Sequence, residues 1–265
     1  MGEIIDVHTH AFPDTLAQRA MKALSEECDA PAFLDGTIGS LLRSMDACGV
    51  GKSLICSIAT RPTQFESILA WSVSIASERI LPLASIHPAD PDPAGKAARI
   101  AAAGLKGVKL HAYYQDFDVD EERLWPLYAA LAREGLVLVM HAGFDPAYPF
   151  IDRAGPLRNL RVQERFPNLK LVVGHFGSWK QWDEVARWLI GKPIYLETSF
   201  ALDLLPPDVA RDMMCAHPRD YLLFGSDSPW RSVPAALALL RALRLDPALE
   251  RAILGCNARR LLGLK

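Results

Sequence analysis

Eight short apolar segments, each followed by a helical pattern, are the feature that most constrains the fold of this chain. The segments cover residues 4–10, 52–58, 80–86, 107–110, 137–140, 169–173, 194–198 and 221–224. Apolar strands that alternate with helices are typical of a parallel sheet whose outer face is covered by those helices. Eight such units in 265 residues predict an α/β protein with a (β/α)8 TIM barrel, in one domain over residues 1–265.

An open, doubly wound sheet is the alternative architecture. It would more naturally carry a glycine-rich phosphate loop after the first strand, whereas this strand ends in His8-Thr9-His10. Helical patterns cover residues 13–28, 37–48, 63–77, 92–103, 120–133, 156–166, 179–189, 207–216, 233–243 and 247–262. The last pattern predicts an additional C-terminal helix, which either covers the barrel or forms a dimer face.

Composition limits the partners and the compartment. The net charge of −2 gives no indication of nucleic acid or an anionic membrane as partner. The chain has no apolar run of about 18 residues and no signal-peptide pattern at its start. Five scattered cysteines without a C-x-x-C motif indicate reduced thiols. We therefore expect a cytoplasmic protein with a small-molecule substrate, and a homodimer is compatible with the sequence.

Titratable side chains gather where the predicted strands end. Six of the seven histidines lie there, together with a lysine and an aspartate. These residues are His8, His10, His87, Lys109, His111, His141, His175 and Asp227. The carboxyl ends of barrel strands meet at one mouth, where TIM-barrel active sites are built. The distribution therefore predicts a site at that mouth.

Side-chain alternation brings several of these residues to one face. Residues two apart on a strand point the same way, so His8 and His10 share a face and can chelate one cation. Two histidines with other hydrogen-bond partners are the alternative reading. The same alternation turns His141, His175 and Asp227 toward the barrel axis if their strands bury Val139, Val173 and Gly225 there.

Several segments resemble the amidohydrolase superfamily, and most closely its family-2 branch of metal-dependent hydrolases and decarboxylases. They are Ile-Asp-Val-His-Thr-His at 5–10, Gly-Val-Lys-Leu-His at 107–111, Val-Leu-Val-Met-His-Ala-Gly at 137–143, Leu-Val-Val-Gly-His-Phe-Gly at 171–177, Leu-Phe-Gly-Ser-Asp-Ser-Pro at 223–229 and Ile-Leu-Gly-Cys-Asn-Ala-Arg-Arg-Leu-Leu at 253–262. They occur in the family's order and span nearly the whole chain. The resemblance is specific for fold and metal site and much less so for substrate.

The resemblance implies one divalent metal ion held by His8, His10, His141 and Asp227. Imidazoles with one carboxylate suit Zn2+, ahead of Mn2+, Fe2+ or Co2+. Asp227 would also act in catalysis by accepting a proton from the activated water, and His175 would orient or protonate the substrate. The alternatives are a loop-bonded histidine for His141 and a capping or turn residue for Asp227.

Other residues are candidates for substrate binding. Lys109 would either contact a substrate carboxylate, form a structural ion pair or, as in some branches of the superfamily, carry a carbamate that bridges two metals. His111 either lines the pocket or packs at its strand end. Trp230 is the strongest candidate among the aromatic residues of the loops. Three arginines, Arg61, Arg153 and Arg231, either clamp a carboxylate or stay in solvent. We expect structural roles for Asp6 and His87.

Three functions compete. The first is a metal-dependent hydrolase that uses activated water on a small ester, lactone or amide, and this is our prediction. The second is a non-oxidative decarboxylase or hydratase of an aromatic or unsaturated carboxylic acid, which would need a carboxylate clamp beside the metal. The third is a metal-free scaffold or binding protein. The ligand set argues against a scaffold, because buried polar groups are costly without a partner.

Overall fold

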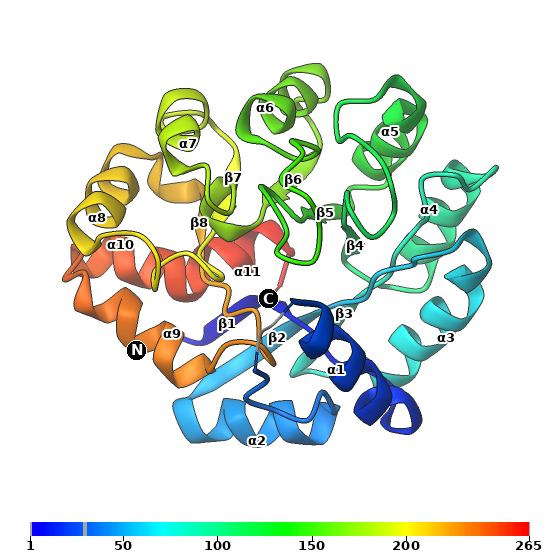
Figure 1. Cartoon of the computed structure of the whole chain (residues 1–265), viewed down its shortest axis with the longest axis horizontal. Coiled ribbons are helices and arrows are strands. Elements are labelled where there is room, and N and C mark those ends of the chain that lie inside the picture. The colour runs from blue at the N-terminus through cyan, green and yellow to red at the C-terminus, as the bar shows by residue number, and fades with distance from the viewer. Residues whose placement is uncertain (1, 29–30, 265) are drawn as a thin grey trace.

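Parallel strands form the centre of the molecule and helices surround them (Figure 1), as the computed structural model shows for residues 2–28 and 31–264. The strands are β1 (Ile4–Thr9), β2 (Val50–Cys56), β3 (Ile80–Leu83), β4 (Gly107–Leu110), β5 (Val137–Met140), β6 (Lys170–Val173), β7 (Tyr195–Glu197) and β8 (Leu222–Leu223). They form two sheets, β1-β2-β3 and β4-β5-β6-β7-β8, each in chain order. This is the α/β barrel that the alternating pattern predicts.

Backbone hydrogen bonds join the two sheets into a barrel. At one junction the N–H of Lys109 donates to the carbonyl of Ala84 over 2.9 Å. At the other the N–H of Val7 donates to the carbonyl of Phe224, also over 2.9 Å. Each junction has one parallel bridge, Ala84 with Val108 and Thr9 with Ser228. The strand ends that carry the titratable residues are therefore neighbours around one ring.

The helices lie close to their predicted positions. They are α1 (Asp14–Cys28), α2 (Ile38–Cys48), α3 (Phe65–Ile75), α4 (Pro93–Ala102), α5 (Trp125–Arg133), α6 (Pro156–Arg165), α7 (Trp182–Trp188), α8 (Pro207–Ala216), α9 (Val233–Ala242), α10 (Pro247–Arg251) and α11 (Asn257–Leu261). Thr37 caps α2 by accepting the N–H of Ser40, and Gly49 ends it with a φ of 75°. Both caps are those expected from the sequence.

Two predicted helices are interrupted. The helix predicted over residues 120–133 begins with a 3₁₀ turn at Glu122–Leu124, and α5 starts only at Trp125. Proline is favoured in the first turn of a helix, and Pro126 fixes that start. The helix predicted over 247–262 contains a π-helical turn at Ala252–Cys256. There Gly255 meets the N-terminal backbone so closely that a Cβ would lie 2.0 Å from the Glu3 carbonyl oxygen.

The first strand is followed by two helices. Helix α2 packs on β2 and α9, as a regular barrel helix does. Helix α1 lies in the connection between β1 and α2. Figure 1 shows α1 near β3 and α3. Of the helix's described side chains only Ala17 and Met21 are buried. Helix α1 therefore adds little to the barrel core and lies at the mouth, where βα connections build functional sites.

The barrel interior has an aliphatic core. Buried Ile5, Val7, Val137, Val139, Val172 and Leu223 meet there with Ala258, Leu261 and Leu262 of the C-terminal segment. Helix α11 thus packs on the barrel and closes the end opposite the mouth, so the C-terminal helix covers the barrel, the first of the two roles expected for it. In Figure 1 it crosses behind the strands. On β6 the interior residue is Val172 and not Val173, so the alternation expected to turn His175 toward the axis was wrong.

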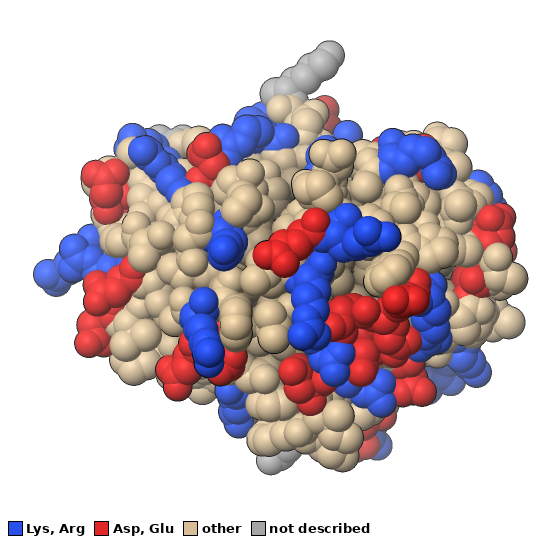
Figure 2. Space-filling view, turned by 90° about the horizontal axis from the view of Figure 1, so that it is seen from above, with Lys and Arg blue, Asp and Glu red and all other residues tan. Residues whose placement is uncertain are grey.

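The surface shows no separation of charge in the view of Figure 2, where acidic and basic side chains lie side by side. Among the helices of the described residues, none is both long and apolar enough for a transmembrane segment. Cys48, Cys56, Cys215 and Cys256 are free thiols. The side chain of Cys28 lies outside the described part of the chain.

Candidate active site

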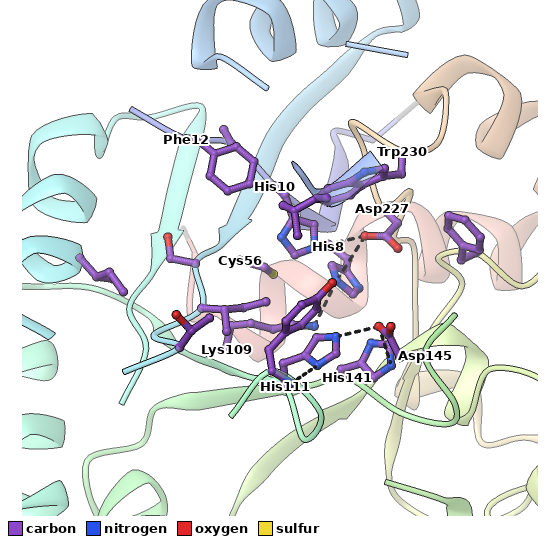
Figure 3. A pocket seen from close by; sticks show the side chains of 18 of the residues that line it. His8, His10, Phe12, Cys56, Lys109, His111, His141, Asp145, Asp227 and Trp230 are labelled. Carbon is purple, nitrogen blue, oxygen red and sulfur yellow. Dashed lines mark hydrogen bonds and ion pairs between the residues drawn. The ribbon is translucent and has the colours of Figure 1, made fainter. Parts of the chain in front are cut away.

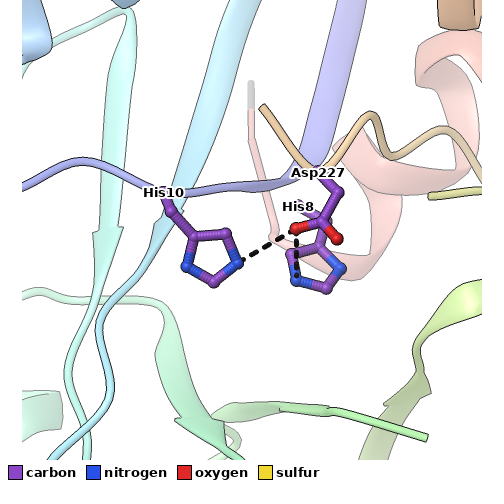
Figure 4. A group of neighbouring side chains, drawn as sticks. All are labelled: His8, His10 and Asp227. Carbon is purple, nitrogen blue, oxygen red and sulfur yellow. Dashed lines mark ion pairs between the residues drawn. The ribbon is translucent and has the colours of Figure 1, made fainter. Parts of the chain in front are cut away.

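The ends of β1 and β8 bring two imidazoles and a carboxylate together (Figure 4). His8 Nε2 lies 3.6 Å from Asp227 Oδ1, and His10 Nε2 lies 3.2 Å from the same oxygen. The N–H of Asp227 donates to the carbonyl of His8 over 2.8 Å, which ties the two strand ends. Ligands of a tetrahedral zinc ion lie about 3.3–3.5 Å from one another, given metal–ligand bonds near 2.1 Å. The separations therefore fit one ion of this class.

Glu197, at the end of β7, fixes the orientation of His8. Its Oε1 lies 2.9 Å from His8 Nδ1, and the same carboxylate accepts the N–H groups of His175 and Ser199. With the proton of His8 on Nδ1, the tautomer assigned from this contact, the lone pair on Nε2 faces the cation position. Burial opposes ionisation of Glu197, but His8 and the hydrogen bonds lower its pKa to about 2.

Glu197 was not among the residues predicted from the sequence. The signal was available, because an acidic residue ends the seventh apolar strand just as Asp227 follows the eighth. Glu197 is fully buried, so its charge needs the surrounding donors to be stable there.

Lys109 is buried below His8, with its Nζ 3.1 Å from His8 Nε2. No carboxylate within the described residues forms an ion pair with it, so the structure offers no support for a structural ion pair. Burial lowers the pKa of Lys109. Burial, followed by the proximity of Lys109, also lowers the pKa of His8 to about 4, which keeps its imidazole neutral and able to bind a metal.

The register of the sheet determines the position of His141. Leu110 pairs with Met140, so the next residues, His111 and His141, are neighbours with ring centroids 3.9 Å apart. His141 Nδ1 lies 3.0 Å from His175 Nε2, and burial lowers the pKa of His141 well below its usual value. His175 Nδ1 lies 3.2 Å from the Ser199 carbonyl and donates to it in this arrangement. A neutral His141 must then donate from Nδ1, which leaves a lone pair on its Nε2.

That lone pair of His141 faces other acceptors. The carbonyl oxygen of Phe144 lies 3.2 Å from His141 Nε2 and Asp145 Oδ2 lies 3.9 Å away. With a proton on Nε2, the Phe144 contact is the loop hydrogen bond of the alternative reading. With the proton on Nδ1, as assigned from the contact with His175, the three acceptors fit a cation position, and the ligand role of His141 stays a prediction. His141 does not, however, belong to the tight group of His8, His10 and Asp227 but to a second group with His111 and Asp145.

Asp145 was likewise not predicted from the sequence. It is buried, and its Oδ2 lies 3.3 Å from His111 Nε2. His111 Nδ1 accepts a long hydrogen bond from the N–H of Tyr114, so Nε2 is left to donate to Asp145. His111 therefore lines the pocket as a hydrogen-bond donor to a carboxylate.

The backbone is strained at this site. His175, Phe176 and Asp227 have φ values of 55°, 53° and 65°. Residues other than glycine rarely adopt positive φ angles, and those that do cluster at functional sites. Burial opposes ionisation of Asp227, but His8 and His10 hold its pKa well below the usual range. Asp6 lies below, where it accepts the N–H groups of His8 and Ser226, and burial raises its pKa to about 7.

A pocket with a volume of about 420 Å³ lies over the site (Figure 3). Its titratable lining residues include His8, His10, Lys109, His111, His141, Asp145, His175 and Asp227. Trp230 forms one wall and meets the ring of His10 edge to face, with centroids 5.2 Å apart. The indole N–H groups of Trp179 and Trp230 have no acceptor within the described residues. The rest of the lining is predominantly apolar and aromatic, as is usual for pockets that bind small molecules.

An arginine clamp, one of the two roles considered for Arg61, Arg153 and Arg231, is not found among the described lining residues. Arg231 forms an ion pair with Asp203 and lies over the ring of Phe200, 3.9 Å from its centroid. Arg153 pairs with Asp116, and the exposed Arg61 lies at the start of a 3₁₀ turn. His87 is also outside the lining, where its Nδ1 accepts the N–H of Ala89.

A parallel barrel with titratable residues at the carboxyl ends of its strands defines the class of TIM-barrel enzymes. The chain belongs to the amidohydrolase family, whose model matches residues 5–264. Members of this family use a divalent metal. A comparison with curated protein sequences finds no match.

Solved structures share the fold over nearly the whole chain. An uncharacterised TIM-barrel protein from Bordetella bronchiseptica is 22% identical, with a TM-score of 0.80 and 99% of each chain covered. A 2,6-dihydroxybenzoate decarboxylase bound to 2,6-dihydroxybenzoate is 17% identical, with a TM-score of 0.74 and 100% of each chain covered. A 5-carboxyvanillate decarboxylase from Novosphingobium aromaticivorans, complexed with manganese, is 15% identical, with a TM-score of 0.74 and 99% and 96% coverage.

Proposed function

We propose that the chain is a metal-dependent hydrolase that adds water to a neutral carbonyl compound, an ester, lactone or amide. The observation that carries this proposal is the group of His8, His10 and Asp227 on the floor of an apolar pocket whose described lining contains no arginine. Among the described lining residues, a substrate carboxylate would have the buried Lys109 beside the ion to compensate the loss of water, and no arginine. A neutral carbonyl group needs no such compensation.

His8 and His10 would hold the ion with Asp227, and His141 would complete the set from the second group. When bound, a zinc-class ion acts as a Lewis acid and lowers the pKa of water toward neutrality. Both histidine contacts of Asp227 involve Oδ1. Its Oδ2 is thus available to accept the proton of the attacking water, and the depressed pKa of Asp227 keeps that oxygen ionised.

His175 would orient the substrate. Its Nδ1 lies 3.2 Å from the Ser199 carbonyl, which fixes the ring with Nε2 toward His141. To protonate the leaving group, His175 would turn Nε2 away from His141 and pass on the proton that Asp227 accepts from the attacking water. Trp230 would cover the opposite side of the reacting group and exclude water from it.

Non-oxidative decarboxylation of an aromatic acid is the second candidate. It is favoured by Lys109, the one cationic side chain among the described lining residues, 3.1 Å from His8 Nε2. The solved decarboxylases of similar fold also favour it. In this reaction Lys109 and the ion together would bind the substrate carboxylate.

Metal analysis and a paired substrate screen test both candidates. The protein and its Asp227→Asn variant are purified without added metal, and zinc and manganese are measured per subunit. Each is then assayed with p-nitrophenyl acetate and dihydrocoumarin, and separately for CO2 release from 2,6-dihydroxybenzoate. We expect about one ion per subunit and hydrolysis that the variant loses by at least about 100-fold. CO2 release without hydrolysis would replace the first candidate by the second, and absence of metal binding would exclude both.

A further inference from the structure

The pocket extends from the cluster of histidines to a region between α1 and α3. Leu16 and Leu24 of α1 line this region, together with Ile68 and Trp71 of α3 and the neighbouring Phe12 and Ile58. We call these six residues the apolar arm. Residues 16 and 24 are about 12 Å apart along a helix with a rise of 1.5 Å per residue. The arm is thus an elongated extension of the pocket.

The apolar arm contains side chains that the protein itself leaves partly uncovered. Leu16 is 42% exposed, and Phe12, Ile58, Ile68 and Trp71 are only partly buried. Exposed apolar surface is costly in water, by about 25 cal/mol per Å². A bound hydrocarbon group would remove this surface from water on both helices at once.

Beside the arm, Gln64 and Ser67 are engaged in hydrogen bonds within the protein, whereas the hydroxyl of Ser57 has no partner among the described residues. Gln64 Oε1 accepts the N–H of Arg61 and the hydroxyl of Thr60. The hydroxyl of Ser67 donates to the carbonyl of Gln64. Their hydrogen bonds therefore satisfy one another, and the arm contains no charged residue. Recognition in this part of the pocket depends on apolar contact.

We propose that the apolar arm is the subsite for the acyl group of the substrate, and that this group is an extended hydrocarbon chain. This rests on the proposed function, because the metal group fixes where the carbonyl carbon lies. Helix α1 is the element that determines specificity. The substrate class is then a medium-chain acyl ester or amide, or a lactone with an alkyl substituent.

Binding of two hydroxamates, which chelate zinc through the same head group, tests the proposal. Acetohydroxamate carries one methyl group, whereas octanohydroxamate carries a chain long enough for the arm. Each is titrated into zinc-loaded and metal-free protein by calorimetry. Each buried methylene contributes about fourfold in affinity, so we expect octanohydroxamate to bind at least about 50-fold more tightly. Ile68→Trp and Leu24→Trp, which fill the arm, should each reduce this ratio to below about 5-fold.

Val73→Trp is the matched control, because Val73 lies on the same helix α3 but is 47% exposed and outside the pocket lining. It should keep the ratio of the wild type. Equal affinities for the two hydroxamates, or a ratio unchanged in both arm variants, would overturn the subsite. The dependence of binding on zinc is measured separately, by comparing the zinc-loaded with the metal-free protein. Chain-length preference without zinc dependence would support the arm and contradict the metal site, and no binding of either probe would overturn both.

Discussion

Glu197 connects two strand ends of the site. It contacts His8 through Nδ1 and accepts the backbone N–H groups of His175 and Ser199, so it orients His8 and the loop of His175. Carboxylates that accept the second ring N–H of a metal-binding histidine fix its tautomer and raise its basicity. In this arrangement the carboxylate orients the ring of His8 through its contact with Nδ1.

Replacement of Glu197 by glutamine should weaken metal binding. The amide has no charge, and its NH2 group can face the N–H donors that the carboxylate now accepts. Loss of such a partner typically reduces metal affinity 10- to 100-fold. We expect a reduction of about that size in a zinc competition assay with a chromogenic chelator. Glu164→Gln, an exposed change on α6, should have no effect, and equal affinities in the two variants would contradict the role of Glu197.

His217 should make the protein less stable in weak acid. It is buried, its Nε2 lies 3.0 Å from the Ile194 carbonyl, and burial lowers its pKa to about 4. The unfolded chain takes up this proton near pH 6.5, so stability is lost as the pH falls from about 6.5 toward 4. From pH 7 to pH 5 this residue should account for about 2 kcal/mol of lost unfolding free energy.

Urea denaturation of the metal-free protein at pH 7 and pH 5 measures this effect. His217→Gln keeps a donor for the Ile194 carbonyl but cannot titrate. The variant should therefore lose about 2 kcal/mol less than the wild type between the two pH values. An identical loss in both proteins would show that His217 does not respond to pH.

At the scale of elements, the loops after β5 and β6 support each other. Gly143 forms a parallel bridge with Trp179, whose N–H donates to the carbonyl of Ala142 over 2.9 Å. Gly143 has a φ of 85°, and a Cβ there would lie 2.1 Å from the Trp179 backbone nitrogen. This close approach keeps His141 and Asp145 in place beside the loop of His175.

Gly143→Ala should therefore destabilise the protein far more than expected from the strain of a positive φ angle alone, because the added Cβ would also meet the Trp179 backbone. Gly191 has a similar φ of 83°, but a Cβ added there would meet no other atom within 4 Å, so Gly191→Ala isolates the strain of the angle. We expect a loss of about 1 kcal/mol for Gly191→Ala and about 3 kcal/mol for Gly143→Ala. Guanidinium denaturation compares the two, and equal losses would show that the backbone contact is unimportant.

The sequence predicts elements better than contacts between them. Periodicity and capping residues locate the strands and most helices, because these depend on neighbours along the chain. The apolar pattern of α1 was equally clear, but its position at the mouth was not, since nothing local distinguishes a helix that covers a strand from one that lines a pocket. Asp145 was missed for the same reason, because its partner His111 is distant in the sequence. Glu197 had a local signal at its strand end, but its contact with His8 could not be predicted from the sequence.

At the scale of the whole molecule, an ion that joins β1 to β8 would cross-link a junction between the two sheets. Zinc should therefore stabilise the folded protein, by about 2.7 kcal/mol at 100 times its dissociation constant. Thermal unfolding with and without zinc measures this gain. The Asp227→Asn variant should lose most of this stabilisation by zinc. Mg2+ should stabilise the wild type only slightly, because it prefers oxygen ligands. A gain unchanged in the variant would place the ion elsewhere.

Zinc as the resident ion, a homodimer and a cytoplasmic location remain predictions from the sequence. The barrel itself and membership of the amidohydrolase family are confirmed. The fold was predictable because apolar alternation repeats eight times. The substrate was not, because the pocket walls come from loops and helices whose packing is set only in three dimensions.

The closure of the barrel by α11 also has a consequence during biosynthesis. Ala258, Leu261 and Leu262 complete the aliphatic interior that begins with Ile5 and Val7 of β1. On the ribosome these early strands emerge first and must wait for almost the whole chain before water is excluded from their inner face. We therefore expect nascent chains to bind chaperones until α11 has left the exit tunnel.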